Sequence, residues 1–162
     1  MRLLVYMLEM DDPSKCTAAK LVRFGIAKRV YKIPSNSILL DPYSSTILSK
    51  DDVNHDLTAL DCSWNDTSIF RHNIAKIKRR LPLLFAGNPI NYSKPNKLST
   101  AEALAAACII LGHKELAISI INKFKWGYTF LTLNNELLDD YSQADRNSIA
   151  KIEQDYISSI YG

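Results

Sequence analysis

The segment LDCSWND, residues 60–66, places an acidic and an aromatic side chain where they could act on a ligand. Asp61 directly follows an apolar run with strand character, and α/β sheets usually bind ligands at the carboxyl ends of their strands. At such an edge Asp61 and Trp64 are placed where they could contact a ligand. Two structural roles stay open from this segment alone, with Asp61 capping the next helix and Trp64 filling the core.

A second candidate is Thr17, in the segment DPSKCTAAK of residues 12–20. It lies near the start of a predicted helix that Asp12 or Ser14 can cap. A hydroxyl beside free backbone N–H groups can bind a carboxylate or a phosphate. The signal is weak by itself, because most helices begin with similar residues.

The segment RHNIAKIKRR, residues 71–80, contains five Lys or Arg and no acidic residue. On a predicted helix over 68–80, Arg71, Lys78 and Arg79 fall near one face, with Lys76 and Arg80 beside it. Residues 1–100 carry a net charge of +6 and residues 101–162 a net charge of −3. This asymmetry favours a polyanionic partner, RNA or DNA, while a solvated charged surface is the alternative.

Several common chemistries lack their motifs here. The chain has no GxGxxG, GxxxxGK[ST], GxSxG or HExxH, so dinucleotide, P-loop and common hydrolase chemistry are unsupported. His55, His72 and His113 have no ligand spacing, and three distant cysteines argue against zinc or a disulfide framework. We therefore expect no metal.

The elements that must position these residues follow from hydrophobic patterning. Of the 162 residues, 47% are hydrophobic and 23% charged, which suits one domain or two small lobes sharing a core. Strand-like runs occupy residues 2–10, 30–33, 37–42, 57–64 and 81–88, and residues 43–56 carry no clear element. Strands and helices thus alternate up to about Asn88, which predicts an α/β sheet.

The remainder of the chain reads as helical. Ser99 and Glu102 form a capping box for a helix that ends at Gly112, and helices are predicted over 113–124, 130–144 and 146–162. We divide the chain into an α/β region, residues 1–92, and a helical region, residues 93–162. No apolar run approaches the roughly 20 residues of a membrane span, so we expect a cytoplasmic protein that contacts no membrane. The helical region offers no clear dimer interface, which favours a monomer.

Four segments occur together in the order typical of one family: DPSKCTAAKL, LLDP, LDCSW and RLPLLFAGNPINYSKPNKLSTAEALAAACIILG. By them the chain resembles the small-subunit (16S/18S) rRNA aminocarboxypropyltransferases, which are ribosome biogenesis proteins. The resemblance implies a SPOUT-like fold whose C-terminal helical lobe contains a deep trefoil knot. It also implies transfer of the 3-amino-3-carboxypropyl group of S-adenosyl-L-methionine to N3 of an N1-methylpseudouridine in small-subunit rRNA.

The resemblance further implies which residues bind the cofactor. Thr17 would hold the carboxylate of the aminocarboxypropyl arm, with a second N–H from the helix start at Thr100, and the carbonyl of Leu60 would meet the ribose. Either Leu81 or Leu84 would contact adenine through its backbone. The full implied cofactor set is Thr17, Leu40, Pro42, Leu60, Trp64, Leu81, Leu84, Leu98, Ser99, Thr100 and Ala103.

The rRNA must reach these residues, and the basic residues nearest to them in sequence are the candidates. These candidate rRNA contacts are Lys15, Lys20, Arg23, Arg71, Lys76, Lys78, Arg79 and Arg80. If Trp64 covers the methyl group of the sulfonium, the aminocarboxypropyl carbon is the one presented, and the indole face would also favour the cation. Asp61 is then the candidate catalytic residue, as general base or as electrostatic support of the sulfonium. A SPOUT-type methyltransferase and a non-catalytic ribosome-assembly module that binds RNA are the alternatives.

Overall fold

The structure is a computed structural model that describes residues 1–7, 16–61 and 75–162. The chain forms two compact units, one from residues 1–46 and 54–80 and the other from residues 47–53 and 81–162. Residues 81–92, which the sequence analysis grouped with the α/β region, therefore pack with the helical unit. Trp64, Lys15 and Arg71 lie outside the described residues.

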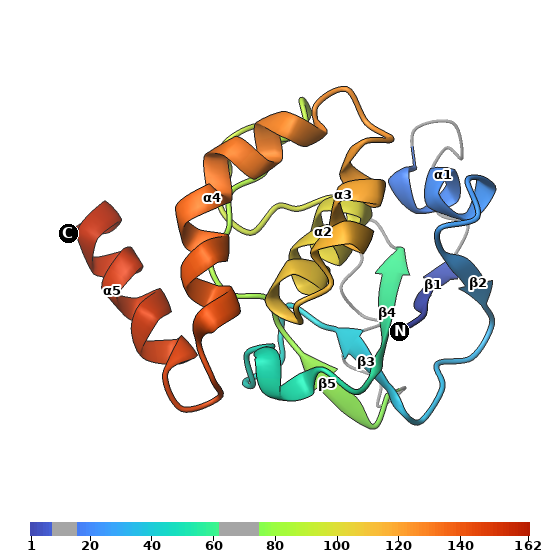
Figure 1. Cartoon of the computed structure of the whole chain (residues 1–162), viewed down its shortest axis with the longest axis horizontal. Helices are drawn as coiled ribbons and strands as arrows, with labels where there is room; N and C mark the ends of the chain where they lie inside the picture. The colour runs from blue at the N-terminus through green and yellow to red at the C-terminus, as the bar shows by residue number, and fades with distance from the viewer. Residues whose placement is uncertain (8–15, 62–74) are drawn as a thin grey trace. The chain divides into compact units, whose positions relative to one another are not determined.

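The first unit is built on a parallel sheet of five strands in the order β2-β1-β4-β3-β5 (Figure 1). β1 pairs along its whole length with β4, from Leu3 opposite Leu57 to Met7 opposite Asp61. Every side chain of β3 is buried, as expected for an inner strand of a parallel sheet. The strands are β1 (Leu3–Met7), β2 (Lys28–Val30), β3 (Ser37–Leu40), β4 (Asp56–Asp61) and β5 (Ile77–Arg79).

Helix α1 (Thr17–Arg23) connects β1 to β2. Its N-cap is Cys16, whose sulfur accepts a hydrogen bond from the N–H of Ala19 at 3.4 Å, so the predicted capping by Asp12 or Ser14 is wrong. Gly25 turns the chain with a φ of +75°, and Ile26 and Ala27 then donate to the carbonyl of Leu21. β2 starts two residues earlier than the strand predicted over 30–33.

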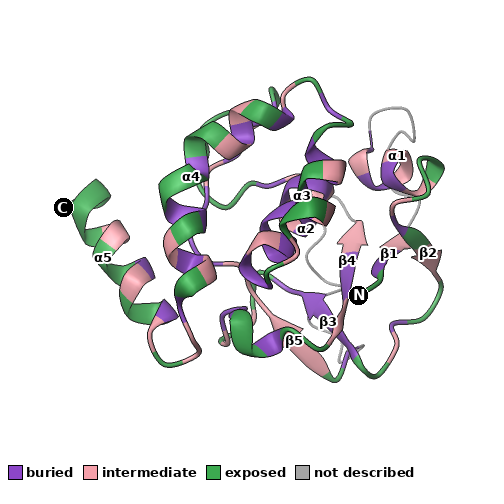
Figure 2. Cartoon of the chain, viewed as in Figure 1, coloured by how far each residue is buried: buried purple, intermediate pink, exposed green. Residues whose placement is uncertain are grey.

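The second unit is helical, and most residues of its first helix, α2, are buried (Figure 2). The predicted capping box is confirmed, with Ser99 as the N-cap and Glu102 bonded back to it. Gly112 ends the helix with a φ of +87°, a conformation that favours glycine. The helices are α2 (Thr100–Ile110), α3 (Lys114–Ile121), α4 (Gly127–Gln143) and α5 (Ile149–Tyr161).

Residues 47–53 belong to the second unit although they precede β4. They contain the short 3-10 helix η1 (Lys50–Asp52), in a stretch where no element was predicted. The guanidinium of Arg146 donates to the buried carboxylate of Asp52 at 2.5 Å and to the carbonyl of Ile47 at 3.0 Å. This ion pair, in which Asp52 is buried and Arg146 is partly exposed, holds the segment against the connection between α4 and α5.

Two sequence predictions are wrong about secondary structure. Residues 77–79 form strand β5 instead of continuing a helix over 68–80, and residues 62–74 of that range lie outside the described residues. Residues 81–88, predicted as the last strand, form no strand, and Phe85 makes an isolated bridge with Pro95. β-Branched and aliphatic residues are favoured in strands because they suit half-buried surfaces, and such surfaces also occur in irregular segments.

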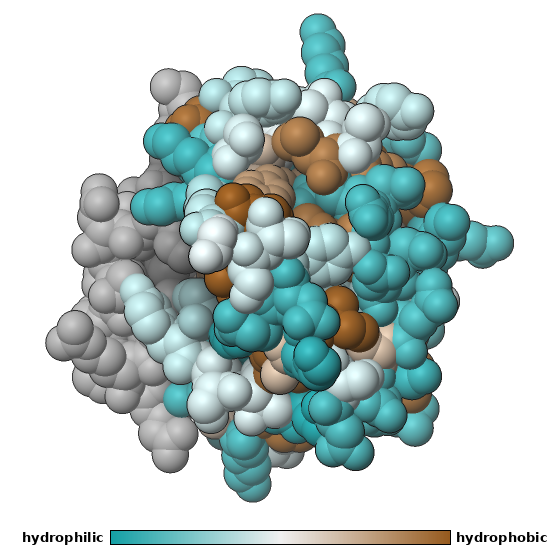
Figure 3. Space-filling model, turned by 90° about the vertical axis from the view of Figure 1, so that its left-hand side faces the viewer, coloured by the Kyte–Doolittle hydropathy of each residue, from teal (hydrophilic) through white to brown (hydrophobic). Residues whose placement is uncertain are grey.

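No described helix is long and apolar enough to cross a bilayer. On the face shown in Figure 3, hydrophobic residues come to the surface in several patches separated by hydrophilic ones.

Candidate functional site

The carboxyl edge of the sheet in the first unit brings Asp61 beside the start of α1. Asp61 is the last residue of β4 and pairs with Met7, the last residue of β1. The thiol of Cys16 donates a hydrogen bond to Oδ2 of Asp61 at 2.8 Å. Since Cys16 caps α1, the first helical residue, Thr17, follows directly on the residue bonded to Asp61.

The environment of Cys16 keeps its thiol protonated. Burial is the main cause that raises its pKa to about 11, and the hydrogen bond to Asp61 adds to the effect. A protonated thiol is a donor, which is what the carboxylate of Asp61 needs from this neighbour. The structure therefore assigns Cys16 a role in orienting Asp61, which sequence reasoning had missed.

Three other candidate residues lie near the carboxyl ends of β3 and β4. Leu40 ends β3 opposite Ala59 and Arg79, and its side chain is buried. Leu60 is half-buried, and Pro42 is exposed in the turn after β3. Asp41 fixes that turn because its carboxylate accepts from the N–H of Tyr43 at 2.8 Å, while its own N–H donates to the carbonyl of Arg79.

In the second unit, buried helix side chains hold the backbone of residues 83–88. The carboxylate of Glu153 accepts from the N–H of Leu83 at 2.8 Å, and the hydroxyl of Tyr141 donates to the carbonyl of Leu83 at 3.0 Å. Asn134 accepts from the N–H of Phe85 and donates to its carbonyl, both at 2.8 Å. These side chains replace the neighbours that a strand would have had, which explains why the expected strand is missing.

Glu102 completes this arrangement from the first turn of α2. Its buried carboxylate accepts from the N–H groups of Gly87 and Ser99, at 2.6 and 2.9 Å, and from both the N–H and the side-chain amide of Asn88. Four donors converge on two oxygens, so only an acceptor-only group satisfies them. Gly87 also lies against α4, where a Cβ atom would come within 2.5 Å of the nitrogen of Phe130.

Leu84 lies between Leu83 and Phe85, whose backbone groups are held by these buried side chains. Its side chain is fully buried and its carbonyl accepts from the N–H of Asn96 at 2.8 Å. Among the described residues its own N–H has no acceptor, whereas the N–H groups on either side, of Leu83 and Phe85, each donate to a buried side chain. The hydrogen bonds to Leu83 and Phe85 thus fix the position of the Leu84 N–H, a backbone donor that no other described residue accepts from.

The remaining cofactor candidates of the second unit cluster at the start of α2. Ser99 and Thr100 are half-buried, as is Ala103 one turn on, and Leu98 is buried just before the cap. The first N–H groups of a helix have no partner inside the helix and attract anions. Leu81 is half-buried at the point where the chain enters the second unit.

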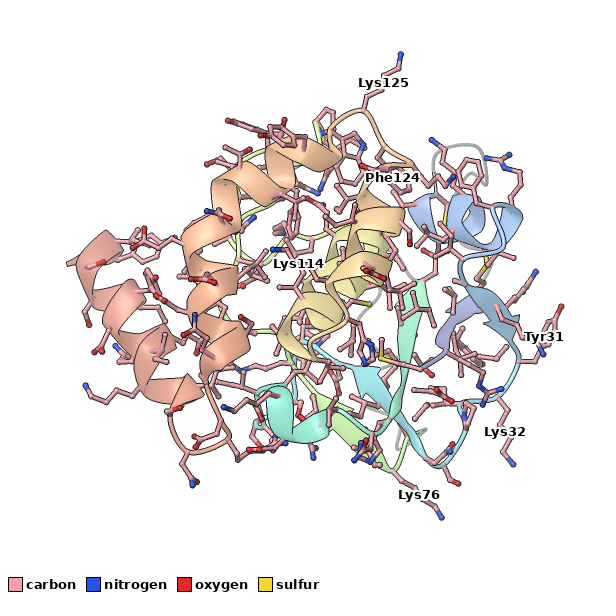
Figure 4. The ribbon with its side chains drawn as sticks, in the orientation of Figure 1. Tyr31, Lys32, Lys76, Lys114, Phe124 and Lys125 are labelled. Carbon is pink, nitrogen blue, oxygen red and sulfur yellow. The ribbon has the colours of Figure 1, made fainter. Side chains whose placement is uncertain are left out.

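The basic residues of the first unit are arranged differently from the prediction. In strand β5, neighbouring side chains alternate between the two faces of the sheet, so Lys78 and Arg79 do not share a helical face, and that prediction is wrong. Lys76 is exposed and points away from the ribbon (Figure 4), while Lys78, Arg79 and Arg80 are half-buried. Lys20 and Arg23 lie in the second half of α1.

Four side chains of the second unit bond the backbone of residues 83–88, and the sequence indicated one of them. The capping box signalled Glu102, but its four donors could not be foreseen from local sequence. Asn134, Tyr141 and Glu153 carried no signal, because they are ordinary polar residues in helical patterns. Among the described residues no group of three or more His, Cys, Asp or Glu side chains could hold a metal ion.

Comparisons with known proteins place the chain in a family. Residues 38–157 match the family model described as "Ribosome biogenesis protein, C-terminal". Residues 1–31 match a model described as a possible Fer4-like domain in RNase L inhibitor. Because that range has Cys16 as its one cysteine and iron–sulfur clusters are held by several thiolates, we assign it no cluster.

Relatives match over nearly the whole chain. The 16S rRNA aminocarboxypropyltransferase of Sulfurisphaera tokodaii is 45% identical over 98% of both chains, and that of Methanococcoides burtonii is 44% identical over 94% of this chain and 93% of its own. A solved structure, the SAM-dependent rRNA:acp-transferase Tsr3 from Vulcanisaeta distributa, is 41% identical with a TM-score of 0.83, covering 93% of this chain and 88% of its own. The resemblance carried by residues 12–21, 39–42, 60–64 and 80–112 is thereby confirmed, and the chain belongs to the 16S rRNA aminocarboxypropyltransferase family of ribosome biogenesis proteins.

Proposed function

We propose that the protein is an S-adenosyl-L-methionine-dependent rRNA aminocarboxypropyltransferase. Its substrate is small-subunit rRNA, and the acceptor is N3 of an N1-methylpseudouridine modified during ribosome biogenesis. The observation that carries this proposal is the agreement in sequence and fold, over nearly the full length, with a solved transferase of that activity.

The described residues of the second unit fit the cofactor. The N–H of Leu84 is a fixed donor in an apolar setting, which suits a ring nitrogen of adenine, so we assign the backbone contact to Leu84 and not to Leu81. Leu98 and Ala103 would supply apolar contacts to the base. Ser99 and Thr100 would present the helix N-terminus to the carboxylate of the aminocarboxypropyl arm.

The described residues of the first unit also fit the cofactor. Thr17 is the first residue of α1, next to Cys16, and its hydroxyl would hold the carboxylate of the aminocarboxypropyl arm. Leu60 precedes Asp61 at the carboxyl edge and would accept from a ribose hydroxyl through its carbonyl. Leu40 and Pro42 would contact the base from the end of β3. The indole of Trp64, which lies outside the described residues, would cover the sulfonium.

The cofactor supplies a sulfonium whose three attached carbons can each be attacked. The protein must therefore choose the carbon by position. We propose that Trp64 shields the methyl group while Thr17 fixes the far end of the aminocarboxypropyl arm. Asp61, oriented by the thiol of Cys16, would accept the proton from N3 of the acceptor base.

The finer features of the fold and setting belong to the same proposal. A parallel sheet followed by helices is consistent with a SPOUT-like fold in which the C-terminal part forms a deep trefoil knot. Free buried thiols at Cys16 and Cys108 suit a reducing compartment, so we propose a cytoplasmic, monomeric protein acting on the pre-ribosomal small subunit. The divisions 1–92 and 93–162 remain proposed functional regions, while the compact units consist of residues 1–46 with 54–80 and of residues 47–53 with 81–162.

One experiment tests the activity. The protein is incubated with unmodified small-subunit rRNA and either carboxyl-labelled or methyl-labelled S-adenosyl-L-methionine. The mass of the modified nucleoside is then measured by mass spectrometry. We expect the carboxyl label in the RNA and the mass of one aminocarboxypropyl group. Transfer of the methyl label would make the protein a methyltransferase, and failure to bind the cofactor by calorimetry would make it a non-catalytic assembly module.

A further inference from the structure

The stretch between β1 and β4 has an unusual charge pattern. Residues 13–40 include six Lys or Arg and no Asp or Glu. Several of these lie on or next to α1 and β2, together with two exposed aromatic side chains. We call this the α1–β2 surface, and it consists of Arg23, Phe24, Lys28, Arg29, Tyr31 and Lys32.

The two aromatic members are both exposed. The side chain of Tyr31 is 79% exposed and that of Phe24 is 48% exposed. Tyr31 and Lys32 point away from the ribbon just after β2 (Figure 4). Exposed aromatic side chains also occur elsewhere on this chain, but aromatic rings placed among cations are typical of surfaces that bind single-stranded nucleic acids.

Arg29 holds the ring of Tyr31 in a defined position. Its guanidinium carbon lies 5.0 Å from the centroid of the ring, a cation–π contact. One face of the ring is thereby covered, and the high exposure of Tyr31 leaves room for a second planar group. Tyr rings and Arg planes are the groups on which proteins stack unpaired bases.

The cationic side chains of the α1–β2 surface lie on or near the edge strand β2, close in sequence to Tyr31. β2 is the last strand on its side of the described sheet. Lys28 is exposed as its first residue, and Lys32 is exposed two residues after its end. The short connection from Arg23 to Lys28 keeps the end of α1 next to this strand. Lysines also protect edge strands from aggregation, but that role does not require an exposed aromatic ring.

We propose that the α1–β2 surface binds an unpaired stretch of the small-subunit rRNA, with a base stacked on Tyr31 and phosphates at Lys28 and Lys32. This inference rests on the proposed function for the identity of the RNA. A duplex would offer its phosphates but keep its bases stacked, so it would not use the aromatic side chains. The surface is distinct from the basic residues at positions 76–80.

The test compares matched variants in rRNA binding and in transfer. Tyr31→Ala is paired with Tyr128→Ala, since Tyr128 is also 79% exposed but lies on α4. Lys28→Gln/Lys32→Gln is paired with Lys114→Gln/Lys125→Gln, which removes the same charge from exposed positions of the second unit. Affinity for unmodified small-subunit rRNA is measured over a range of salt, and cofactor affinity by calorimetry.

We expect Tyr31→Ala to weaken rRNA binding about 5- to 100-fold, with cofactor binding unchanged. The double lysine variant should reduce the slope of log affinity against log salt by about 1.4. The control variants should bind as the wild type does. A Tyr31→Phe variant should retain most of the affinity, because the stacking ring is kept.

The possible results separate this inference from the proposed function. If the wild type transfers the aminocarboxypropyl group but both α1–β2 variants bind rRNA normally, the surface proposal is wrong and the function stands. Variants that bind naked rRNA normally but lose affinity for precursors carrying ribosomal proteins would assign the surface to a protein partner, and would also overturn the proposal. Absence of transfer by the wild type, with impaired rRNA binding by the variants, would overturn the function alone.

Discussion

Oδ2 of Asp61 lies 2.8 Å from the sulfur of Cys16, so the N-cap of α1 is bonded to the last residue of β4. The contact connects two segments that are 45 residues apart in sequence. It joins the residue proposed as the base to the residue preceding Thr17, which is proposed to hold the cofactor's carboxylate. The thiol is therefore a positioning group for both proposed functions.

The first prediction concerns the pH dependence of stability at Cys16. Its pKa is raised from 9.0 to about 11, so the folded protein favours the protonated thiol more than the unfolded chain does. The resulting contribution of the Cys16 thiol to the free energy of unfolding is fully present below pH 9 and is lost as the pH rises toward 11. We expect the stability difference between wild type and Cys16→Ser, measured by denaturant unfolding, to shrink over that interval. A difference that stays constant from pH 8 to 11 would contradict the assignment.

The second prediction concerns the carboxylate of Asp61. Asp61→Asn keeps an oxygen that can accept from Cys16 but removes the basic group. We expect cofactor affinity within about twofold of wild type and single-turnover transfer slowed about 100-fold or more, the usual contribution of a general base. Asp155→Asn, in an exposed pair with Lys151, is the control for lost charge. Unchanged transfer by Asp61→Asn would show that Asp61 is not the base.

The third prediction concerns the indole of Trp64. A cation–π contact with a desolvated sulfonium contributes about 2 kcal/mol, so Trp64→Ala should weaken cofactor binding roughly 30-fold. Trp64→Phe retains an aromatic face and should lose less. Calorimetry with S-adenosyl-L-methionine measures both, and unchanged affinity for Trp64→Ala would remove this residue from the site.

The fourth prediction concerns Glu102. Glu102→Gln has the same shape, but its amide group would face two of the four donors that now converge on the carboxylate. Leaving buried donors unsatisfied costs about 1–3 kcal/mol each, so for two donors we expect a loss of about 2–6 kcal/mol in the free energy of unfolding. Glu115→Gln, on the exposed side of α3, should change stability by less than about 0.5 kcal/mol. Equal stability of the two variants would show that the four bonds do not hold residues 87–88.

The fifth prediction concerns the two hydrogen bonds between Asn134 and the backbone of Phe85. Asn134→Ala removes the partner of both the N–H and the carbonyl of Phe85 and should destabilise the protein by about 2–4 kcal/mol. Because Leu84 adjoins this contact, cofactor affinity should fall as well, even under conditions where the variant is fully folded. Asn122→Ala, at an exposed position after α3, is the matched control. A destabilised variant with normal cofactor affinity would show that Leu84 does not contact adenine.

The sequence alone determined the family, the order of most elements and the placement of the helices after residue 98. Local signals were sufficient there, since the Ser99–Glu102 capping box and the glycine at 112 act within a few residues of the ends that they mark. The motif LDCSW likewise indicated an acid at the end of a strand, and Asp61 does end β4. Family motifs could be recognised because they are contiguous in the chain.

Only the tertiary structure decided what holds residues 81–88 and what orients Asp61. Hydrophobic patterning predicted a strand over 81–88, but its backbone groups are bonded by Glu102, Asn134, Tyr141 and Glu153 from three different helices. The Cys16–Asp61 bond likewise joins separate segments of the first unit. Partners that are distant in sequence leave no periodic or local signal, because the hydrogen bond forms only after packing has brought the two segments together.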